Sequence, residues 1–237
     1  MNADFRDRLQ QIVEGVVPEL RERAREDIEH VLGIGVESVD ALFSALENEH
    51  TDPETRKILC WVAARLEDER ATLPLIRLLS HSDEELREEA ARSLGQIGGV
   101  KAVEPLIDAL LLDRVADVRC AAAYALGLIG DTRAMTPLIQ ILSDRSEAPA
   151  VRGFAAEALA DLEEPAAVKP LVDALSDASQ EVRFWATFAL GEISTVEALP
   201  ELERVAASDE GILPGYGLVR DKAKEAIERI NERTRGT

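Results

Sequence analysis

Cysteine, histidine and aromatic residues are scarce in this sequence of 237 residues. The two cysteines, Cys60 and Cys120, cannot form a disulfide framework, and sparse cysteine is typical of a reducing compartment, so we expect a cytoplasmic protein. The three histidines are far apart, and neither a His-Glu-x-x-His nor a Cys-x-x-Cys pattern occurs. We therefore expect no metal site and no cofactor.

Long apolar runs and an excess of basic residues are also missing. No stretch of about 18 apolar residues occurs, and Met1 to Gln11 is charged, so we expect neither a membrane span nor a secretory signal. Lys and Arg number 27 against 46 Asp and Glu, which gives a net charge of −19. A negative field of this size repels phosphate backbones and disfavours nucleic acid as a partner.

What the sequence does contain is an internal repeat. Prolines recur at spacings of 31, 32, 33 and 30 residues, at Pro74, Pro105, Pro137, Pro170 and Pro200. Arginines recur at spacings of 31, 32, 33, 31 and 37 residues, at Arg56, Arg87, Arg119, Arg152, Arg183 and Arg220. Because two independent markers keep nearly the same period, the sequence predicts a stack of similar structural units.

Each unit contains two helical segments. The first, as in Ala102–Leu110, carries the proline near its start, where the missing N–H costs little. The second, as in Val118–Gly130, is rich in alanine and leucine and ends at a glycine that suits a helix stop. Its apolar residues recur with a helical period, as in Leu86, Ala90, Ala91, Leu94 and Ile97. Such pairs bury their apolar faces only by stacking, which predicts an all-α solenoid without a β-sheet.

These units resemble HEAT repeats, in the short form found in phycobilisome lyase-type (PBS lyase) HEAT-like proteins. The resemblance is carried by Glu85–Gly98, Asp117–Asp131 and Glu181–Ile193 with their proline-containing first helices, and it covers roughly Val36 to Ile230. It implies a right-handed α-α superhelix of helical hairpins whose second helices line the concave face. The ankyrin and tetratricopeptide signatures are absent.

The two ends depart from the repeat, as capping segments do. We expect residues 1–35 to form an N-terminal helical cap, broken near Gly15–Pro18 and Gly33–Gly35. Residues 36–232 are expected to form a solenoid of about six repeats, and residues 233–237 a disordered tail. The last repeat carries an insertion at 211–217, rich in glycine, which predicts a loop between its two helices. A plain connection and a loop that contacts a ligand are both open interpretations.

A helical wheel identifies the residues that lie opposite the apolar stripe, namely those one, two, five and nine places after each repeated arginine. These 24 positions hold six of the nine aromatic residues, where an even spread would place about one. Exposed aromatic residues are typical anchors of protein interfaces. With two arginines, the predicted partner-binding residues are Trp61, Arg65, Arg92, Tyr124, Phe154, Phe184, Trp185 and Phe188. The alternative is that these rings only pack between neighbouring helices.

Charged residues at the same positions nearly balance, with seven acidic and five basic side chains. Lys57, Arg65 and Arg92 form a candidate basic end for an acidic partner segment, and simple solvation is the alternative. Glu157 and Asp161 stand four residues apart and are a candidate carboxylate pair, but such pairs are common on solvated helices. No histidine occupies these positions, so we do not predict an enzyme.

The repeated arginines and the two cysteines have structural interpretations. Each arginine adjoins the apolar stripe and has acids nearby, such as Asp83, Asp117 and Glu181, so we expect bonds to carboxylates and helix ends between repeats. Cys60 falls on the buried side. Cys120 falls on the outer side, where it is interpreted as a filler, with a reactive thiol as the alternative.

These observations predict a non-catalytic scaffold, an adaptor or assembly factor that is monomeric or weakly dimeric. Its partner is another protein or a peptide, bound in an aromatic-rich concave groove. The resemblance implies an alternative, because phycobilisome lyase-type proteins attach or detach open-chain tetrapyrroles on phycobiliproteins. Under that alternative the partner is a bilin or a phycobiliprotein, held between flat aromatic rings.

Overall fold

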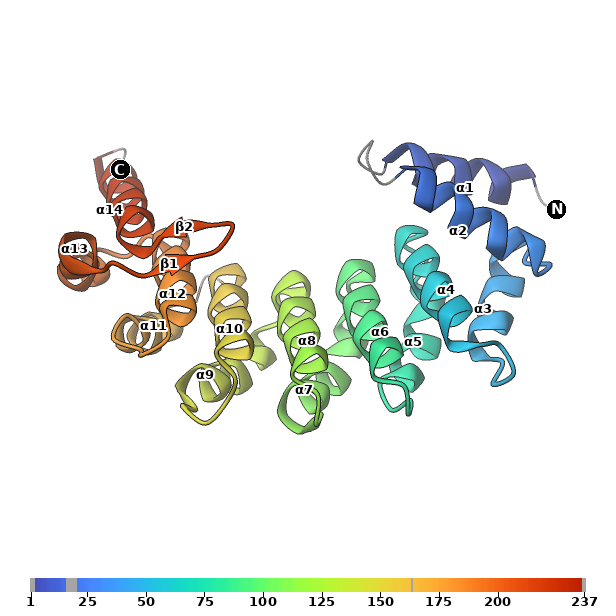
Figure 1. The fold of residues 1–237 in the computed structure, drawn as a ribbon, viewed down its shortest axis with the longest axis horizontal. Helices are drawn as coiled ribbons and strands as arrows, with labels where there is room; N and C mark the ends of the chain where they lie inside the picture. The colour runs from blue at the N-terminus through green and yellow to red at the C-terminus, as the bar shows by residue number, and fades with distance from the viewer. Residues whose placement is uncertain (1–2, 16–20, 163, 236–237) are drawn as a thin grey trace. The chain divides into compact units, whose positions relative to one another are not determined.

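The computed structural model describes residues 3–15, 21–162 and 164–235. The chain divides into two compact units, Met1–Leu106 (unit 1) and Ile107–Thr237 (unit 2). Both units consist of paired helices, in which the first helix of a pair packs on the second (Figure 1). This arrangement confirms the predicted all-α repeat fold.

Unit 1 begins with two helices that precede the first repeat, α1 (Ala3–Gly15) and α2 (Arg21–Gly33). Helix α2 ends at Gly33, where the sequence predicts a break, whereas most of the break predicted at Gly15–Pro18 falls outside the described residues. Short 3₁₀ turns, η2 (Glu69–Ala71) and η3 (Val100–Ala102), lead into first helices. The repeat helices are α3 (Val39–Glu47), α4 (Pro53–Arg65), α5 (Thr72–Leu78), α6 (Glu84–Ile97) and α7 (Val103–Leu112), of which α7 continues into unit 2.

Unit 2 continues the same alternation of helices. The first helices follow the 3₁₀ turns η4 (Thr132–Ala134), η5 (Pro165–Ala167) and η6 (Val196–Ala198). The helices are α8 (Ala116–Ile129), α9 (Met135–Ser143), α10 (Pro149–Asp161), α11 (Val168–Ala174), α12 (Gln180–Ile193), α13 (Leu199–Ser208) and α14 (Val219–Arg235).

Two expectations about the C-terminal end are corrected by the structure. Helix α14 runs to Arg235, so residues 233–235 are helical rather than part of a disordered tail. The insertion between α13 and α14 forms a small antiparallel hairpin of β1 (Ile212–Leu213) and β2 (Gly217–Leu218), so the fold is not free of β-structure. Gly215 and Gly217 have positive φ angles there, which tight turns require and glycine allows.

Local chemistry explains where the helices begin and end. Side chains of Asp52 and Asp83 accept hydrogen bonds from backbone N–H groups in the first turns of α4 and α6, which satisfies donors that the helix leaves free. Each repeated proline stands within the first three residues of its helix, as predicted. Gly130, with φ of 69°, closes α8 in the left-handed conformation that favours glycine.

Small residues bring the second helices of unit 2 close together. A Cβ built on Gly127 of α8 would lie 2.9 Å from Cα of Ala158 in α10, and one on Gly191 of α12 would lie 2.9 Å from Cβ of Ala226 in α14. The apolar stripe is buried as predicted in its central turns, whereas Ile97 in the last turn of α6 is half-buried. This close packing fixes the outer side of each second helix, where the candidate site lies.

Candidate partner-binding surface

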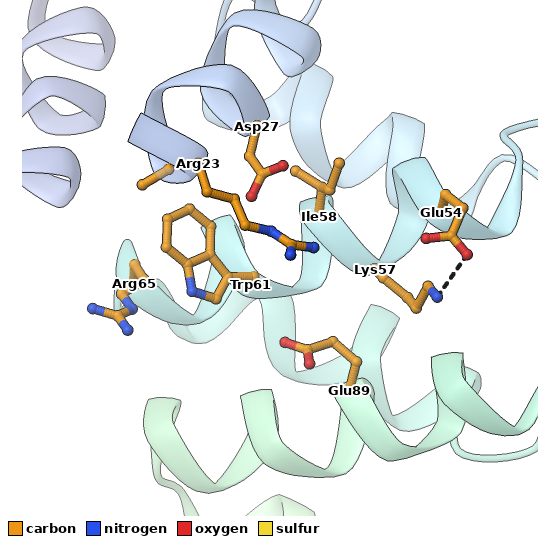
Figure 2. Close-up of a pocket in the computed structure, with 9 residues that line it drawn as sticks. Arg23, Asp27, Glu54, Lys57, Ile58, Trp61, Arg65 and Glu89 are labelled. Carbon is orange, nitrogen blue, oxygen red and sulfur yellow. Dashed lines mark ion pairs between the residues drawn. The ribbon is translucent and has the colours of Figure 1, made fainter. Parts of the chain in front are cut away.

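Unit 1 holds a pocket of about 480 Å³ around Trp61. Residues of α2, α4 and α6 line it, and Figure 2 shows Arg23 and Glu89 reaching toward the indole from α2 and α6. The guanidinium carbon of Arg65 lies 5.3 Å from the centroid of the Trp61 ring, a cation–π contact. Trp61 is half-buried and Arg65 is exposed, so both predicted residues are accessible.

The predicted basic end of this surface is partly neutralised within unit 1. Lys57 pairs with Glu54 and Glu85, and these carboxylates raise its pKa. Arg92 donates two hydrogen bonds to one oxygen of Glu88, at 2.7 and 3.1 Å. Arg65 has no carboxylate partner among the described residues. The structure therefore brings Trp61, Arg65 and Lys57 to one pocket but leaves only one of the three predicted basic groups without an acid.

Unit 2 carries four half-buried aromatic residues on three neighbouring second helices. Tyr124 lies on α8, Phe154 on α10, and both Trp185 and Phe188 on α12. Helix α10 packs against both α8 and α12. In these helices, the residues one, two, five and nine places after the repeated arginine are called the aromatic face of unit 2.

The prediction that Phe184 is available to a partner is wrong, because its side chain is only 2% exposed. The rings of Trp185 and Tyr216 pack against it, with centroids 5.5 and 5.8 Å away, and Nζ of Lys222 lies 5.6 Å from its centroid. The residue directly after the repeated arginine is also buried in α8 (Cys120) and α10 (Gly153). In these helices that position faces the neighbouring helix rather than solvent. The helical wheel does not distinguish the two environments.

The C-terminal hairpin folds back onto the start of α12. The side-chain amide of Gln180 donates to the carbonyl oxygen of Ile212 at 2.7 Å and accepts from its N–H at 3.3 Å. The ring of Tyr216 packs edge-on against Trp185, with centroids 5.2 Å apart. Ile212 and Tyr216 remain 55% and 62% exposed. The insertion thus packs against α12 within the chain, and a lone tyrosine among glycines was the sequence signal for this packing.

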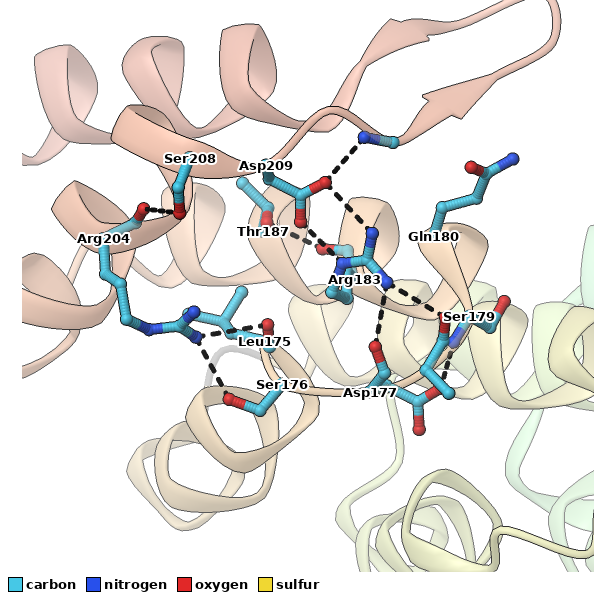
Figure 3. Close-up of polar contacts among 12 residues, drawn as sticks. Leu175, Ser176, Asp177, Ser179, Gln180, Arg183, Thr187, Arg204, Ser208 and Asp209 are labelled. Carbon is cyan, nitrogen blue, oxygen red and sulfur yellow. Dashed lines mark hydrogen bonds and ion pairs between the residues drawn. The ribbon is translucent and has the colours of Figure 1, made fainter.

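Three of the repeated arginines, all in unit 2, bond carboxylates of the following repeat, as predicted. Arg183 donates to both carboxylate oxygens of Asp209 at 2.6 and 3.0 Å, and to the carbonyl oxygen of Asp177 at 2.9 Å (Figure 3). Arg152 forms a buried ion pair with Asp177, and Arg119 pairs with Glu147. The partner acids lie in turns between the two helices of the next repeat, not at Asp83, Asp117 or Glu181. We call these pairs the arginine ladder.

Arg56 in unit 1 occupies the same position but has a different partner. It donates from Nε to the carbonyl oxygen of Leu46 at 3.0 Å, and its Nη1 lies 3.2 Å from Nε2 of His81. His81 therefore stands where an acid stands in unit 2. The ladder arginines are consumed by contacts within the chain and are not offered to a ligand.

Burial raises the pKa of two carboxylates on these surfaces. Burial raises the pKa of Glu89 in unit 1, although the charge of Arg92 opposes the shift. Burial and the charge of Asp161 both raise the pKa of Glu157 in unit 2. Proximity of Glu157 and Asp161 was predicted, but no histidine, cysteine or further acid joins them in a metal-binding group among the described residues.

Both cysteines are buried, and the described helices do not include a membrane span. Burial raises the pKa of the Cys120 thiol to about 12 and that of Cys60 further still. Of the two interpretations of Cys120, a filler and a reactive thiol, the structure favours the filler, because a reactive thiol needs a lowered pKa. Within residues 3–15, 21–162 and 164–235, no helix combines the length and apolar character needed to cross a bilayer.

Solved structures with the same kind of helical repeat are known. No curated protein sequence matches the chain. Among solved structures, a chain of the complex of CpcE and CpcF of phycocyanin lyase from Nostoc sp. PCC7120 is 25% identical with a TM-score of 0.54, covering 67% of this chain and 99% of that one. A designed armadillo repeat protein, YIII(Dq.V1)4CPAF in complex with peptide (KR)4, is 21% identical with a TM-score of 0.54, covering 82% and 100%.

Two family models match the repeat region. The model described as PBS lyase HEAT-like repeat matches residues 118–144, a stretch that spans α8 and α9. The model described as HEAT repeats matches residues 39–127 and 135–214, which is well over half of the sequence. The chain therefore belongs to the HEAT-repeat family.

Proposed function

We propose that this protein is a non-catalytic scaffold, an adaptor or assembly factor, that binds a protein or peptide partner on the outer side of its second helices. The observation that carries the proposal is the aromatic face of unit 2, where Tyr124, Phe154, Trp185 and Phe188 stay half-exposed on three adjacent helices. Rings of this size are usually covered, and partly exposed clusters of them mark interfaces.

A second contact is proposed in unit 1, where Trp61 and Arg65 line the pocket and Arg92 stands on the next second helix. The relative in Nostoc supports a protein partner, because it was solved as a complex of two chains, CpcE and CpcF. Phe184 is no longer part of the proposed contact, since it belongs to the core of unit 2.

The test is capture of partners from the native host with wild-type protein, Phe188→Ala and Trp185→Ala/Phe188→Ala, read by mass spectrometry. The matched control is Phe43→Ala, which removes a half-buried phenylalanine from the first helix α3. Circular dichroism checks the fold of each variant, because Trp185 also packs within the chain.

A protein that is captured by wild type and Phe43→Ala, and lost with Phe188→Ala, supports the proposal. If folded Phe188→Ala and the folded double variant both capture the same proteins as wild type, the aromatic face is not the contact surface. Unfolding of the double variant alone leaves Phe188→Ala to decide, because its ring contacts only Trp185 among the described aromatic rings.

A second candidate function is bilin handling, favoured by the likeness to the phycocyanin lyase chain and by the PBS lyase HEAT-like match. Under it, the aromatic face would hold an open-chain tetrapyrrole. Mixing the protein with phycocyanobilin would then change the visible absorbance of the pigment, and Trp185→Ala/Phe188→Ala would reduce that change. Unchanged spectra at micromolar protein and pigment would exclude this candidate.

A further inference from the structure

The aromatic face of unit 2 carries negative charge without any positive charge of its own. Its residues are Cys120, Ala121, Tyr124, Leu128, Gly153, Phe154, Glu157, Asp161, Phe184, Trp185, Phe188 and Glu192. Three of these are acidic and none is basic. Glu192 is neutralised by an ion pair with Arg229 of α14. The other two acids of this face, Glu157 and Asp161, lie on the central helix, α10.

Glu157 is the acid of this face for which the structure shows no polar partner. It is half-buried, and no hydrogen bond or ion pair joins it to any described residue. Burial and the neighbouring charge of Asp161 both raise its pKa, and no nearby base lowers it. Burying an ionised carboxylate without a partner destabilises a fold, so unit 2 bears a cost here that no internal contact offsets.

Aromatic residues occupy positions next to Glu157 on its own helix and on the two neighbouring helices. Phe154 precedes Glu157 by three residues on α10, so the two share one face of the helix. Tyr124 on α8 and Phe188 on α12 occupy the position equivalent to Glu157 in the neighbouring repeats. The faces of aromatic rings carry partial negative charge and attract cations. The rings and the carboxylate therefore favour the same kind of ligand group.

Asp161 completes the arrangement one turn later. A Cβ built on Gly127 would lie 2.7 Å from Oδ2 of Asp161, which places this carboxylate against α8, at the seam between α8 and α10. Two basic groups of the last repeat contact this face, at Phe184 and Glu192, and both are already in ion pairs: Lys222 with Glu225 and Arg229 with Glu192. An acidic partner would meet only repulsion on this part of the face.

We propose that the partner of the aromatic face is a basic segment, with a lysine or arginine side chain placed on Glu157 between the rings of Tyr124, Phe154 and Phe188. This inference rests on the proposed function, because it names the chemistry of a partner on the same surface. Apolar or aromatic side chains of the segment would lie against Trp185 and Phe188. The unneutralised carboxylate is then a binding feature retained at the expense of stability.

The test uses two labelled, end-capped peptides of equal length, (Lys-Phe-Lys-Gly)₃ and (Glu-Phe-Glu-Gly)₃, titrated with wild type, Glu157→Gln, Phe188→Ala and the control Glu203→Gln. Glu203 is exposed on the first helix α13, so its substitution removes the same charge from another surface. Fluorescence anisotropy gives each dissociation constant, and urea denaturation gives the stability of each variant.

We expect wild type to bind the basic peptide and not the acidic one. Glu157→Gln should weaken binding of the basic peptide by about tenfold or more, whereas Glu203→Gln should change it by less than about twofold. Glu157→Gln should also raise the urea midpoint at neutral pH, because it removes an unpaired charge. Weaker binding by a more stable protein cannot be attributed to unfolding.

Equal binding of both peptides, no binding of the basic peptide to wild type, or full binding by Glu157→Gln would each overturn the inference. If Glu157→Gln binds the basic peptide fully and Phe188→Ala does not, the proposed function stands. Only the proposed contact between Glu157 and a basic side chain is then wrong. Retention of both peptides by Phe188→Ala as well would count against the proposed function itself.

Discussion

The indole of Trp185 in α12 lies over Gly153 in α10, at the point where glycine has no side chain. A Cβ at position 153 would come within 2.8 Å of Cδ1 of the indole and 3.5 Å of its Nε1. The missing side chain thus leaves a slot with room for the Cδ1–Nε1 edge of the largest ring of the aromatic face against the neighbouring helix. Together with the rings of Phe184, Phe188 and Tyr216, this slot leaves Trp185 half-buried.

Gly153→Ala is predicted to displace the indole without unfolding unit 2. The added methyl group meets a side chain that can move, and alanine stabilises a helix relative to glycine by about 1 kcal/mol, so the net change in stability should be small. In a Trp61→Phe background, Trp185 is the only tryptophan, and its emission should shift to longer wavelength. An unchanged spectrum would show that the ring is not held in this slot.

Gly191→Ala is predicted to be far more damaging than Gly153→Ala. Its methyl group would meet Cβ and Cα of Ala226, at 2.9 and 3.1 Å, so the backbones of α12 and α14 would have to separate. Overpacking of this kind costs about 1–3 kcal/mol, which urea denaturation can measure. Gly33→Ala, at the end of α2, meets nothing within 4 Å and is the matched control.

Asp177→Asn is predicted to destabilise the protein by about 3 kcal/mol, because it leaves the guanidinium of Arg152 buried without a counter-charge. The side chains of this pair are only 6% and 7% exposed. Asp173→Asn removes the same charge from an exposed pair with Lys169 and should cost less than about 0.5 kcal/mol. Similar urea midpoints for the two variants would contradict a structural role for the arginine ladder.

The ladder also predicts a loss of stability in acid. The hydrogen bonds from Arg183 hold the pKa of Asp209 below its ordinary value of 3.8. A lowered native pKa stabilises the fold above the unfolded pKa, and that contribution disappears as pH falls through the native pKa. Asp209→Asn should therefore lower the free energy of unfolding at about pH 6, and by a smaller amount at about pH 3. A constant difference at both pH values would refute this assignment.

Gln180→Ala is predicted to release the hairpin from α12. The substitution removes both hydrogen bonds to the backbone of Ile212, so Tyr216 should leave the rings of Phe184 and Trp185 more often. Chymotrypsin should then cut at Tyr216 faster than in wild type, while the melting temperature changes little. Gln96→Ala, an exposed glutamine on α6, is the control. Equal cleavage rates would show that the amide clamp does not hold the hairpin.

The repeat fold could be predicted from the sequence because its causes are local and recur. Prolines at helix starts and the glycine at the end of α8 act within one turn. The apolar stripe follows from helical periodicity, which the sequence displays directly. The regular spacing that includes Arg183 is also visible in the sequence. Its partner Asp209, however, lies 26 residues further along the chain, and only the structure shows which acid the guanidinium reaches.

The sequence predicted which helices carry the aromatic surface, but the prediction for Phe184 was wrong for a geometric reason. A helical wheel places Phe184 and Trp185 on the same outer side. In the structure Phe184 is buried, with Tyr216 of the hairpin and Lys222 of α14 against its ring, whereas Trp185 stays half-exposed. The position of Tyr216 could not be deduced at all, because it depends on how an inserted hairpin folds back over a helix. The shortage of positive charge around Glu157 likewise emerges only when three helices are placed side by side.

The arginine ladder gives unit 2 a direction. Arg119, Arg152 and Arg183 each reach forward to an acid of the next repeat, at Glu147, Asp177 and Asp209. A chain emerging from the ribosome cannot neutralise one of these guanidinium groups until the following turn has been synthesised. We therefore expect cotranslational folding of unit 2 to trail synthesis by about one repeat, with the last turn before the hairpin completing the buried pairing.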